Sequence, residues 1–184
     1  GNVHRLDKDT SGLMVVAKNE KSLFNLSNQI SNRTVTRIYQ AFVVGKISKS
    51  GKIDEPIGRH PSNRQKQSVL SSGKEAITHY SLEATYGNYS HLFLRLETGR
   101  THQIRVHLSH LGFPIIGDPL YGRKRRFAKS TDSKLREVIE QFPRQALHAS
   151  SLGFLHPSTN KKIEFTIELP KDIKNLEAKL AQLS

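Results

Sequence analysis

The chain has 184 residues and no cysteine, so it fits one domain without disulfides, thiolate catalysis or cysteine-ligated metal. Its 29 Lys and Arg against 16 Asp and Glu give a formal charge of +13. This charge indicates a polyanionic binding partner such as nucleic acid, or else a basic domain that has no such partner. No apolar run is long enough to cross a membrane and the start does not resemble a signal peptide, so we expect a cytoplasmic protein.

The first part of the chain predicts a helix between two strands. Residues 13–17 (LMVVA) form a short β-rich apolar run and predict a buried strand. Asn19 can cap a helix over residues 20–32. Residues 37–44 predict a second strand, with Tyr39 on the face opposite its apolar side chains.

The middle of the chain predicts two segments without regular structure, a strand pair and a second helix. Residues 48–52 are rich in turn formers, and residues 56–67 form a polar loop. Residues 76–85 and 91–97 predict two strands joined at a Gly-Asn turn. A helix over 101–111 follows, with Thr101 as a possible N-cap.

The last part of the chain predicts a surface helix, two strands and a closing helix. Their ranges are 132–142, 146–155, 162–169 and 171–183. Strands and helices do not alternate strictly along the whole chain, which favours a mixed sheet with helices on its outside over a doubly wound fold.

Three segments carry candidate functional residues. In residues 4–12 (HRLDKDTSG), Asp7 and Asp9 fit an acid–base pair, a metal half-site or a solvated turn. Residues 99–108 (GRTHQIRVHL) place Arg100 and backbone N–H groups at a helix start, which suits phosphate, whereas the histidine spacing does not favour zinc. Tyr39 fits either a residue that covers the sheet or one that stacks on a base.

Taken together, the segments resemble RNA pseudouridine synthases of the RluA/RluD family. The similarity lies in residues 4–12, in 37–45 around Tyr39 and in 99–107; residues 117–122 and 145–149 are further family-like blocks. Residues 54–61 and 78–80 look most like the D-type enzyme that acts on large-subunit (23S) ribosomal RNA. The resemblance implies an α+β fold with a mixed, mostly antiparallel sheet and flanking helices.

The resemblance also implies roles for individual residues. Asp7 matches the catalytic aspartate, Arg105 the arginine that pairs with it, and Tyr39 the tyrosine that packs on the target base. Arg5 matches an arginine implicated in holding the flipped-out state. Residues expected to hold RNA phosphates are Arg59, Arg64, Lys66, Arg100, Arg123, Lys124 and Arg125. We expect no cofactor, no metal and a monomer.

The expected reaction breaks the C1′–N1 bond of uridine, turns the uracil and rejoins it through C5. Asp7 can serve as nucleophile at C1′ or at the base, or can stabilise charge and move protons. The target must leave its helical stack to reach the carboxylate, so base flipping is expected. The rival hypotheses are a non-catalytic RNA-binding module of the same fold, a metal-dependent nuclease and a structural ribosome-associated protein.

The chain departs from the family pattern at its beginning. The family usually has strands before the His-Arg-Leu-Asp motif, and many members also have a small RNA-binding domain of the S4 type. We therefore expect residues 1–184 to be one catalytic domain, N-terminally truncated and without an S4-type domain.

Overall fold

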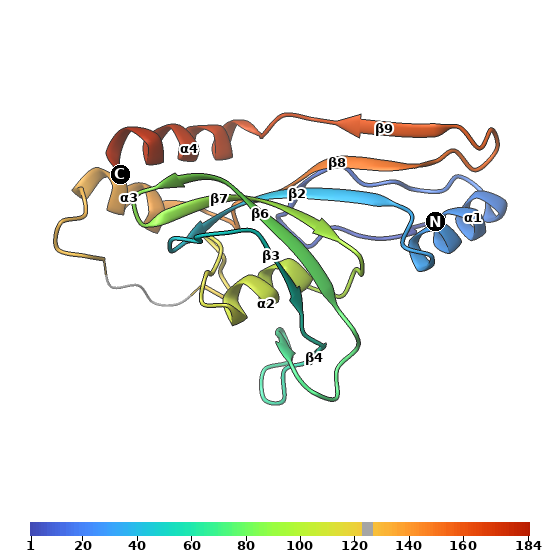
Figure 1. Ribbon diagram of the computed structural model, residues 1–184, viewed down its shortest axis with the longest axis horizontal. Helices are drawn as coiled ribbons and strands as arrows, with labels where there is room; N and C mark the ends of the chain where they lie inside the picture. Colours follow the sequence, from blue (N-terminus) through green and yellow to red (C-terminus); the bar gives the residue numbers. More distant parts are fainter. Residues whose placement is uncertain (123–126) are drawn as a thin grey trace.

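The computed structural model describes residues 1–122 and 127–184, and it is built on one large β-sheet (Figure 1). Seven strands form this sheet in the order β1-β8-β2-β7-β6-β3, with β9 also paired to β8. Their bounds are β1 Ser11–Gly12, β2 Thr36–Val44, β3 Gly51–Asp54, β6 Ile77–Tyr86, β7 Tyr89–Leu96, β8 Leu147–Leu155 and β9 Lys162–Thr166. A separate two-stranded hairpin consists of β4 Ile57–Arg59 and β5 Gln67–Val69.

The sheet is mixed and mostly antiparallel, as the sequence predicted. Its parallel pair is β1 with β8, in which Ser11 lies opposite His148 and Gly12 opposite Ala149. The central strand β2 pairs antiparallel with both β7 and β8. Strands β6 and β7 form the predicted hairpin, and Gly87 at its turn has the positive φ of 56° that such tight turns favour.

Four helices in the described residues flank the sheet: α1 Glu20–Ser31, α2 Gln103–His110, α3 Ser133–Gln141 and α4 Lys171–Leu183. Helix α1 lies near the N-terminus, whereas α3 and α4 lie together at the other end of the molecule (Figure 1). Helix α1 begins as predicted, because the Asn19 side chain accepts a hydrogen bond from the Ser22 backbone N–H at 2.9 Å. Helix α2 is an interior helix rather than a surface helix, since its first six residues are all buried.

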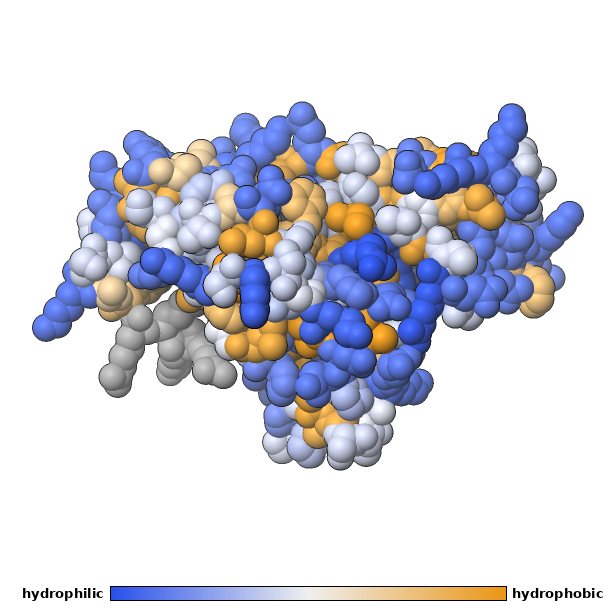
Figure 2. All heavy atoms as spheres, viewed as in Figure 1, coloured by the Kyte–Doolittle hydropathy of each residue, from blue (hydrophilic) through white to orange (hydrophobic). Residues whose placement is uncertain are grey.

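The main hydrophobic core lies between the sheet and the helices α2, α3 and α4. Phe42 and Leu92 from neighbouring strands, Leu108 of α2 and Leu176 of α4 are each no more than 1% exposed. A fully buried side chain of this size stabilises the fold by about 1.5–3 kcal/mol relative to an exposed one. The face seen in Figure 2 is mostly hydrophilic, with apolar side chains scattered among the polar ones.

Three element predictions were wrong. Residues 13–17 are not a buried strand: β1 ends at Gly12, and the side chain of Val16 is half exposed. The predicted polar loop over residues 56–67 contains β4 and the start of β5, whose short strands pair with each other rather than with the main sheet. The predicted turn over residues 48–52 already includes the start of β3.

Candidate active site

Asp7 lies on a tight turn just before β1. The Thr10 backbone N–H donates to the Asp7 carbonyl at 3.0 Å, and Asp9 takes a left-handed conformation with φ of 67°. Side chains from the far end of the chain hold this turn: Gln145 Nε2 donates to the Lys8 carbonyl at 2.7 Å, and Arg144 Nη1 donates to the Asp9 carbonyl at 2.9 Å. The backbone turn that carries Asp7 is thereby held by residues from outside its own segment.

Gly12 fixes where this turn meets the sheet. Its φ is +119°, and a Cβ at this position would lie 2.2 Å from the carbonyl oxygen of Ala149. Only a residue without a side chain allows the β1 backbone to approach β8 so closely. The glycine at the end of the first motif is therefore required by the parallel pairing that anchors Asp7.

Helix α2 brings Arg105 to Asp7. Nη1 of Arg105 lies 3.5 Å from Oδ2 of Asp7. Its Nε and Nη2 donate to the two carboxylate oxygens of Asp118 at 2.8 and 2.9 Å. Burial alone would lower the pKa of Arg105, but Asp118 and then Asp7 outweigh it and raise that pKa above its usual value. Asp118 was missed as a site residue, although it is the acidic residue of the family-like block 117–122.

Tyr121 extends the site on the other side of Arg105. Its ring centroid lies 5.1 Å from the Arg105 guanidinium carbon, and its hydroxyl shares a 2.7 Å hydrogen bond with Nδ1 of His102. The same hydroxyl accepts a hydrogen bond from the backbone N–H of Gln67 at 2.8 Å, which ties the β4–β5 hairpin to the site. The sequence predicted no role for Tyr121.

The start of α2 differs from the prediction. Thr101 is not the N-cap: His102 takes that position, with φ of 56° and no side-chain cap. Instead, Oε1 of Gln103 accepts hydrogen bonds from the Arg100 backbone N–H at 3.0 Å and the Thr98 hydroxyl at 2.8 Å. The buried Gln103 side chain thus closes the strand-to-helix turn that carries Arg105.

Tyr39 borders the same pocket as Asp7. The pocket has a volume of about 610 Å³ and is lined by both residues together with the start of α2. Burial, countered in part by Arg37 and supported by Asp7, raises the pKa of Tyr39 to about 12. The phenol therefore stays protonated at neutral pH, in keeping with a packing surface for a base.

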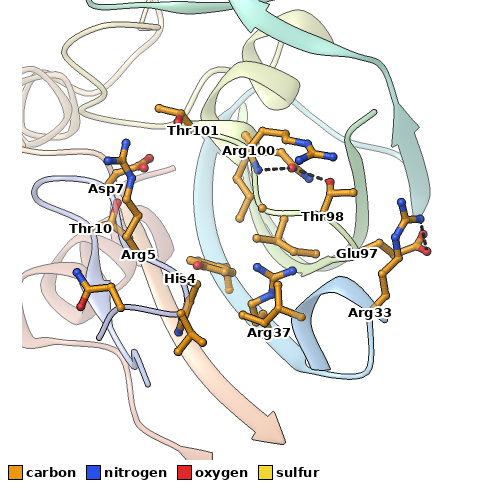
Figure 3. A pocket seen from close by; sticks show the side chains of 18 of the residues that line it. His4, Arg5, Asp7, Thr10, Arg33, Arg37, Glu97, Thr98, Arg100 and Thr101 are labelled. Atoms are coloured by element: carbon orange, nitrogen blue, oxygen red, sulfur yellow. Dashed lines mark hydrogen bonds and ion pairs between the residues drawn. The ribbon is translucent and has the colours of Figure 1, made fainter. Parts of the chain in front are cut away.

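Figure 3 shows how the pocket-lining side chains are arranged: His4, Arg5, Asp7 and Thr10 come from the N-terminal segment, and Arg33, Arg37, Thr98 and Arg100 lie across from them. Two of the predicted RNA contacts, the exposed Arg5 and the half-buried Arg100, are among these. Nε of Arg100 donates to the Glu75 carbonyl at 2.7 Å, which steadies that side chain at the rim.

Other predicted RNA contacts lie outside this pocket lining. Arg59 and Arg64 are exposed on the β4–β5 hairpin, which projects from the body of the molecule (Figure 1). Lys66 on the same hairpin lies 6.0 Å from the Tyr121 ring centroid, so it reaches the edge of the site. Arg123, Lys124 and Arg125 lie outside the described residues.

Two kinds of feature are absent from the described part of the chain, a metal-binding cluster and a membrane-spanning helix. Within residues 1–122 and 127–184, no three His, Asp or Glu side chains gather in a way that could hold a metal ion. In the same part of the chain, no helix has the length and apolar character needed to span a bilayer.

The sequence comparison assigns this arrangement to a family. Residues 1–110, which include Asp7, Tyr39 and Arg105, match the family model described as RNA pseudouridylate synthase. The chain belongs to this family.

The relatives give the same result. A ribosomal large subunit pseudouridine synthase D of Pseudomonas aeruginosa is 48% identical over 172 residues, which is 94% of this chain and 54% of the relative. The protein of that name in Vibrio cholerae is 49% identical over 173 residues, 94% of this chain and 53% of the relative. The chain thus spans about half the length of the curated relatives it matches.

A solved family structure supports the fold. Human RNA pseudouridylate synthase domain containing 1 superposes with a TM-score of 0.73 at 26% identity, over 97% of this chain and 79% of that one. The prediction of family and fold class is therefore confirmed.

Proposed function

We propose that this chain carries the active site of an RNA pseudouridine synthase, an isomerase that converts uridine to pseudouridine in large-subunit ribosomal RNA. The observation that carries the proposal is the Asp7 carboxylate in a pocket of about 610 Å³, 3.5 Å from the buried Arg105 and beside Tyr39. The names of the bacterial relatives support ribosomal RNA as the substrate. We further propose that the protein acts as a cytoplasmic monomer.

Each site residue has a distinct part in the proposed reaction. The C1′–N1 bond breaks and a C1′–C5 bond forms, while C5 gives up a proton and N1 gains one, so no group is lost. The uridine leaves its stack and enters beside Asp7, which acts on it as the catalytic carboxylate. Arg105, held by Asp118, orients that carboxylate. Tyr39 remains a neutral phenol and packs against the uracil.

The basic residues at and beyond the rim fit a polyanionic substrate. The exposed Arg5, Arg59 and Arg64 and the half-buried Lys66 and Arg100 are proposed to contact phosphates, which positions the RNA without reading its sequence. Because the reaction proposed here needs no external group, we propose that no metal or cofactor takes part.

The test is the pseudouridine content of unmodified large-subunit ribosomal RNA after incubation with the full-length protein in EDTA. The Asp7→Asn substitution keeps the side-chain shape but removes the carboxylate, so we expect pseudouridine formation to fall by several orders of magnitude. Asp9→Asn is the matched control, because Asp9 lies on the same turn, is exposed and does not line the pocket. Asparagine also tolerates its left-handed φ.

Three outcomes contradict the proposal. Equal activity of Asp7→Asn and Asp9→Asn removes Asp7 from the chemistry. Cleavage of the RNA that EDTA abolishes indicates a metal-dependent nuclease. Tight RNA binding without pseudouridine in the wild type indicates a non-catalytic RNA-binding module.

A further inference from the structure

Arg37 is a buried cation in the pocket to which neither the family match nor the sequence analysis gives a role. It is the second residue of β2 and lies two positions before Tyr39, so the two side chains share one face of the strand. Only 5% of Arg37 is exposed, and it lines the pocket together with Asp7 and Tyr39. In Figure 3 it lies across the pocket from Arg5 and Asp7.

In the described part of the chain, the Arg37 guanidinium has no carboxylate partner. Its Nε has no hydrogen-bond partner, and no ion pair joins Arg37 to a carboxylate within residues 1–122 and 127–184. Burial lowers the pKa of Arg37, and among the carboxylates described none raises it. A buried cation without a partner is destabilising, so an anion that enters the pocket would stabilise Arg37.

Two neighbouring arginines show the usual alternative. The Arg33 guanidinium, on the rim of the same pocket, pairs with Glu75 and lies 3.7 Å from Glu97. Arg105 pairs with Asp118 and Asp7. Arg37 differs from both because, in the described residues, its Nε has no partner and its guanidinium lines the pocket without an ion pair to a carboxylate.

The surroundings keep space for the Arg37 guanidinium. A Cβ at Gly99 would lie only 2.7 Å from Nη1 of Arg37, so the glycine leaves that end of the side chain room. His4, which lines the same pocket, has its pKa lowered to about 4 by burial and then by Arg37, so it is neutral at pH 7 and offers no competing charge. The pocket thus has a positive wall next to the surface proposed for the uracil.

We propose that Arg37 is a phosphate receptor, which binds a phosphodiester of the RNA strand adjacent to the uridine held between Asp7 and Tyr39. The identification of the anion as RNA rests on the proposed function. Arginine suits this role because its planar fork can donate two parallel hydrogen bonds to phosphate oxygens. Arg37 is then a binding residue that sets how far the strand enters, while Asp7 performs the chemistry.

The test measures binding separately from chemistry. Oligouridylate binding is followed by fluorescence polarisation over a range of salt concentrations, with every variant made in the full-length Asp7→Asn protein so that no turnover occurs. Arg37→Met should weaken binding by roughly tenfold to a hundredfold, as expected for loss of a charged hydrogen bond. It should also reduce the slope of log K against log salt by about 0.7, the value for one phosphate contact on a single strand.

Two further variants define the role. Arg95→Met is the charge-matched control, because Arg95 is exposed and lies opposite Ile38, on the face of the sheet away from the pocket; it should bind as the reference does. Arg37→Lys keeps the charge without the fork, so it should retain the salt slope and lose part of the affinity.

Thermal unfolding separates a binding role from a structural one. Because Arg37→Met removes an uncompensated buried charge, the free variant should unfold at the same or a higher temperature than the reference. A salt slope equal to that of Arg95→Met, or a lower unfolding temperature, overturns the inference. The two proposals can fail separately. If the wild-type protein binds oligouridylate through Arg37 but forms no pseudouridine, the proposed function is contradicted and the phosphate-binding role of Arg37 still holds.

Discussion

At the scale of single residues, the site depends on one arginine shared by two carboxylates. Asp118 holds Arg105 through two short hydrogen bonds, whereas Asp7 contacts it once at 3.5 Å. The side chain of Asp118 is fully buried, and the backbone N–H groups of Leu120 and Tyr121 also donate to its Oδ1. Asp118 therefore fixes the guanidinium, and Arg105 has one remaining nitrogen with which to orient Asp7.

Replacing Asp118 should affect both stability and activity. Asp118→Asn removes the principal countercharge of a buried arginine, and breaking such a pair costs about 3–5 kcal/mol. We expect the free energy of unfolding in urea to fall by this amount and pseudouridine formation to fall with it. Asp54→Asn, at an exposed carboxylate of β3, is the control. If both variants unfold at the same urea concentration, the buried pair does not stabilise the fold.

The proximity of single residues was predictable where they belong to the motifs that carry the family resemblance. Asp7, Tyr39 and Arg105 were predicted together, and the structure brings Asp7 and Arg105 into contact and Tyr39 into the same pocket. Asp118 and Arg37 were not predicted as site residues, because spacing does not reveal their burial or their partners. The signal for Asp118 was an acidic residue in an otherwise apolar Gly/Pro loop, where an unpaired carboxylate would be costly.

At the scale of elements, the Asp7 turn depends on the close contact of β1 with β8. Gly12→Ala should be strongly destabilising, because it adds both left-handed strain and a clash with the Ala149 carbonyl. Gly112→Ala is a matched control: its φ is +90°, but a Cβ there meets no atom within 4 Å. We expect Gly112→Ala to lose about 1–2 kcal/mol, from strain alone.

The difference in free energy of unfolding between Gly12→Ala and Gly112→Ala measures the cost of the clash with the Ala149 carbonyl. Gly12→Ala should lose clearly more free energy of unfolding in urea than Gly112→Ala, and it should also lose pseudouridine-forming activity because the Asp7 turn moves. Equal losses in the two proteins would show that β1 and β8 can separate without cost.

Elements were predictable where a single periodic pattern determines them. Helix α1, the β6–β7 hairpin and α4 follow from caps, alternation and turn residues within one segment. Residues 13–17 are apolar but do not form the predicted buried strand, because the strand that pairs with β8 consists of Ser11 and Gly12. The start of α2 was misplaced because the Gln103 side chain, rather than Thr101, closes the turn.

At the scale of the whole molecule, buried and half-buried histidines make the fold sensitive to acid. Burial is the largest cause that lowers the pKa of five of them: His4, His91, His102, His107 and His148. For His4 the pKa falls from 6.5 to about 4, and its Nε2 accepts a hydrogen bond from the Val15 N–H at 3.1 Å. Protonation removes that acceptor.

The sign of the pH dependence follows from these lowered pKa values. Between pH 6.5 and about 4 the unfolded chain binds more protons than the folded one, so the free energy of unfolding falls as the pH decreases through this window. Urea denaturation across the window measures the fall. His4→Gln, which keeps an acceptor, should show a weaker dependence, whereas the exposed His110→Gln should match the wild type. A curve that stays flat down to pH 5 would contradict this account.

The pairing of β1 with β8 also determines the order in which the molecule matures. Asp7, Tyr39 and Arg105 are all synthesised before the residues that anchor the Asp7 turn, which are Arg144, Gln145 and the strand that contains Ala149. These contacts join residues 135 and 137 positions apart in sequence, so they have high contact order and form only after Arg144 and Gln145 have left the ribosome. A nascent chain therefore carries Asp7, Tyr39 and Arg105 before their site is assembled, and the proposed activity begins only when β1 pairs with β8.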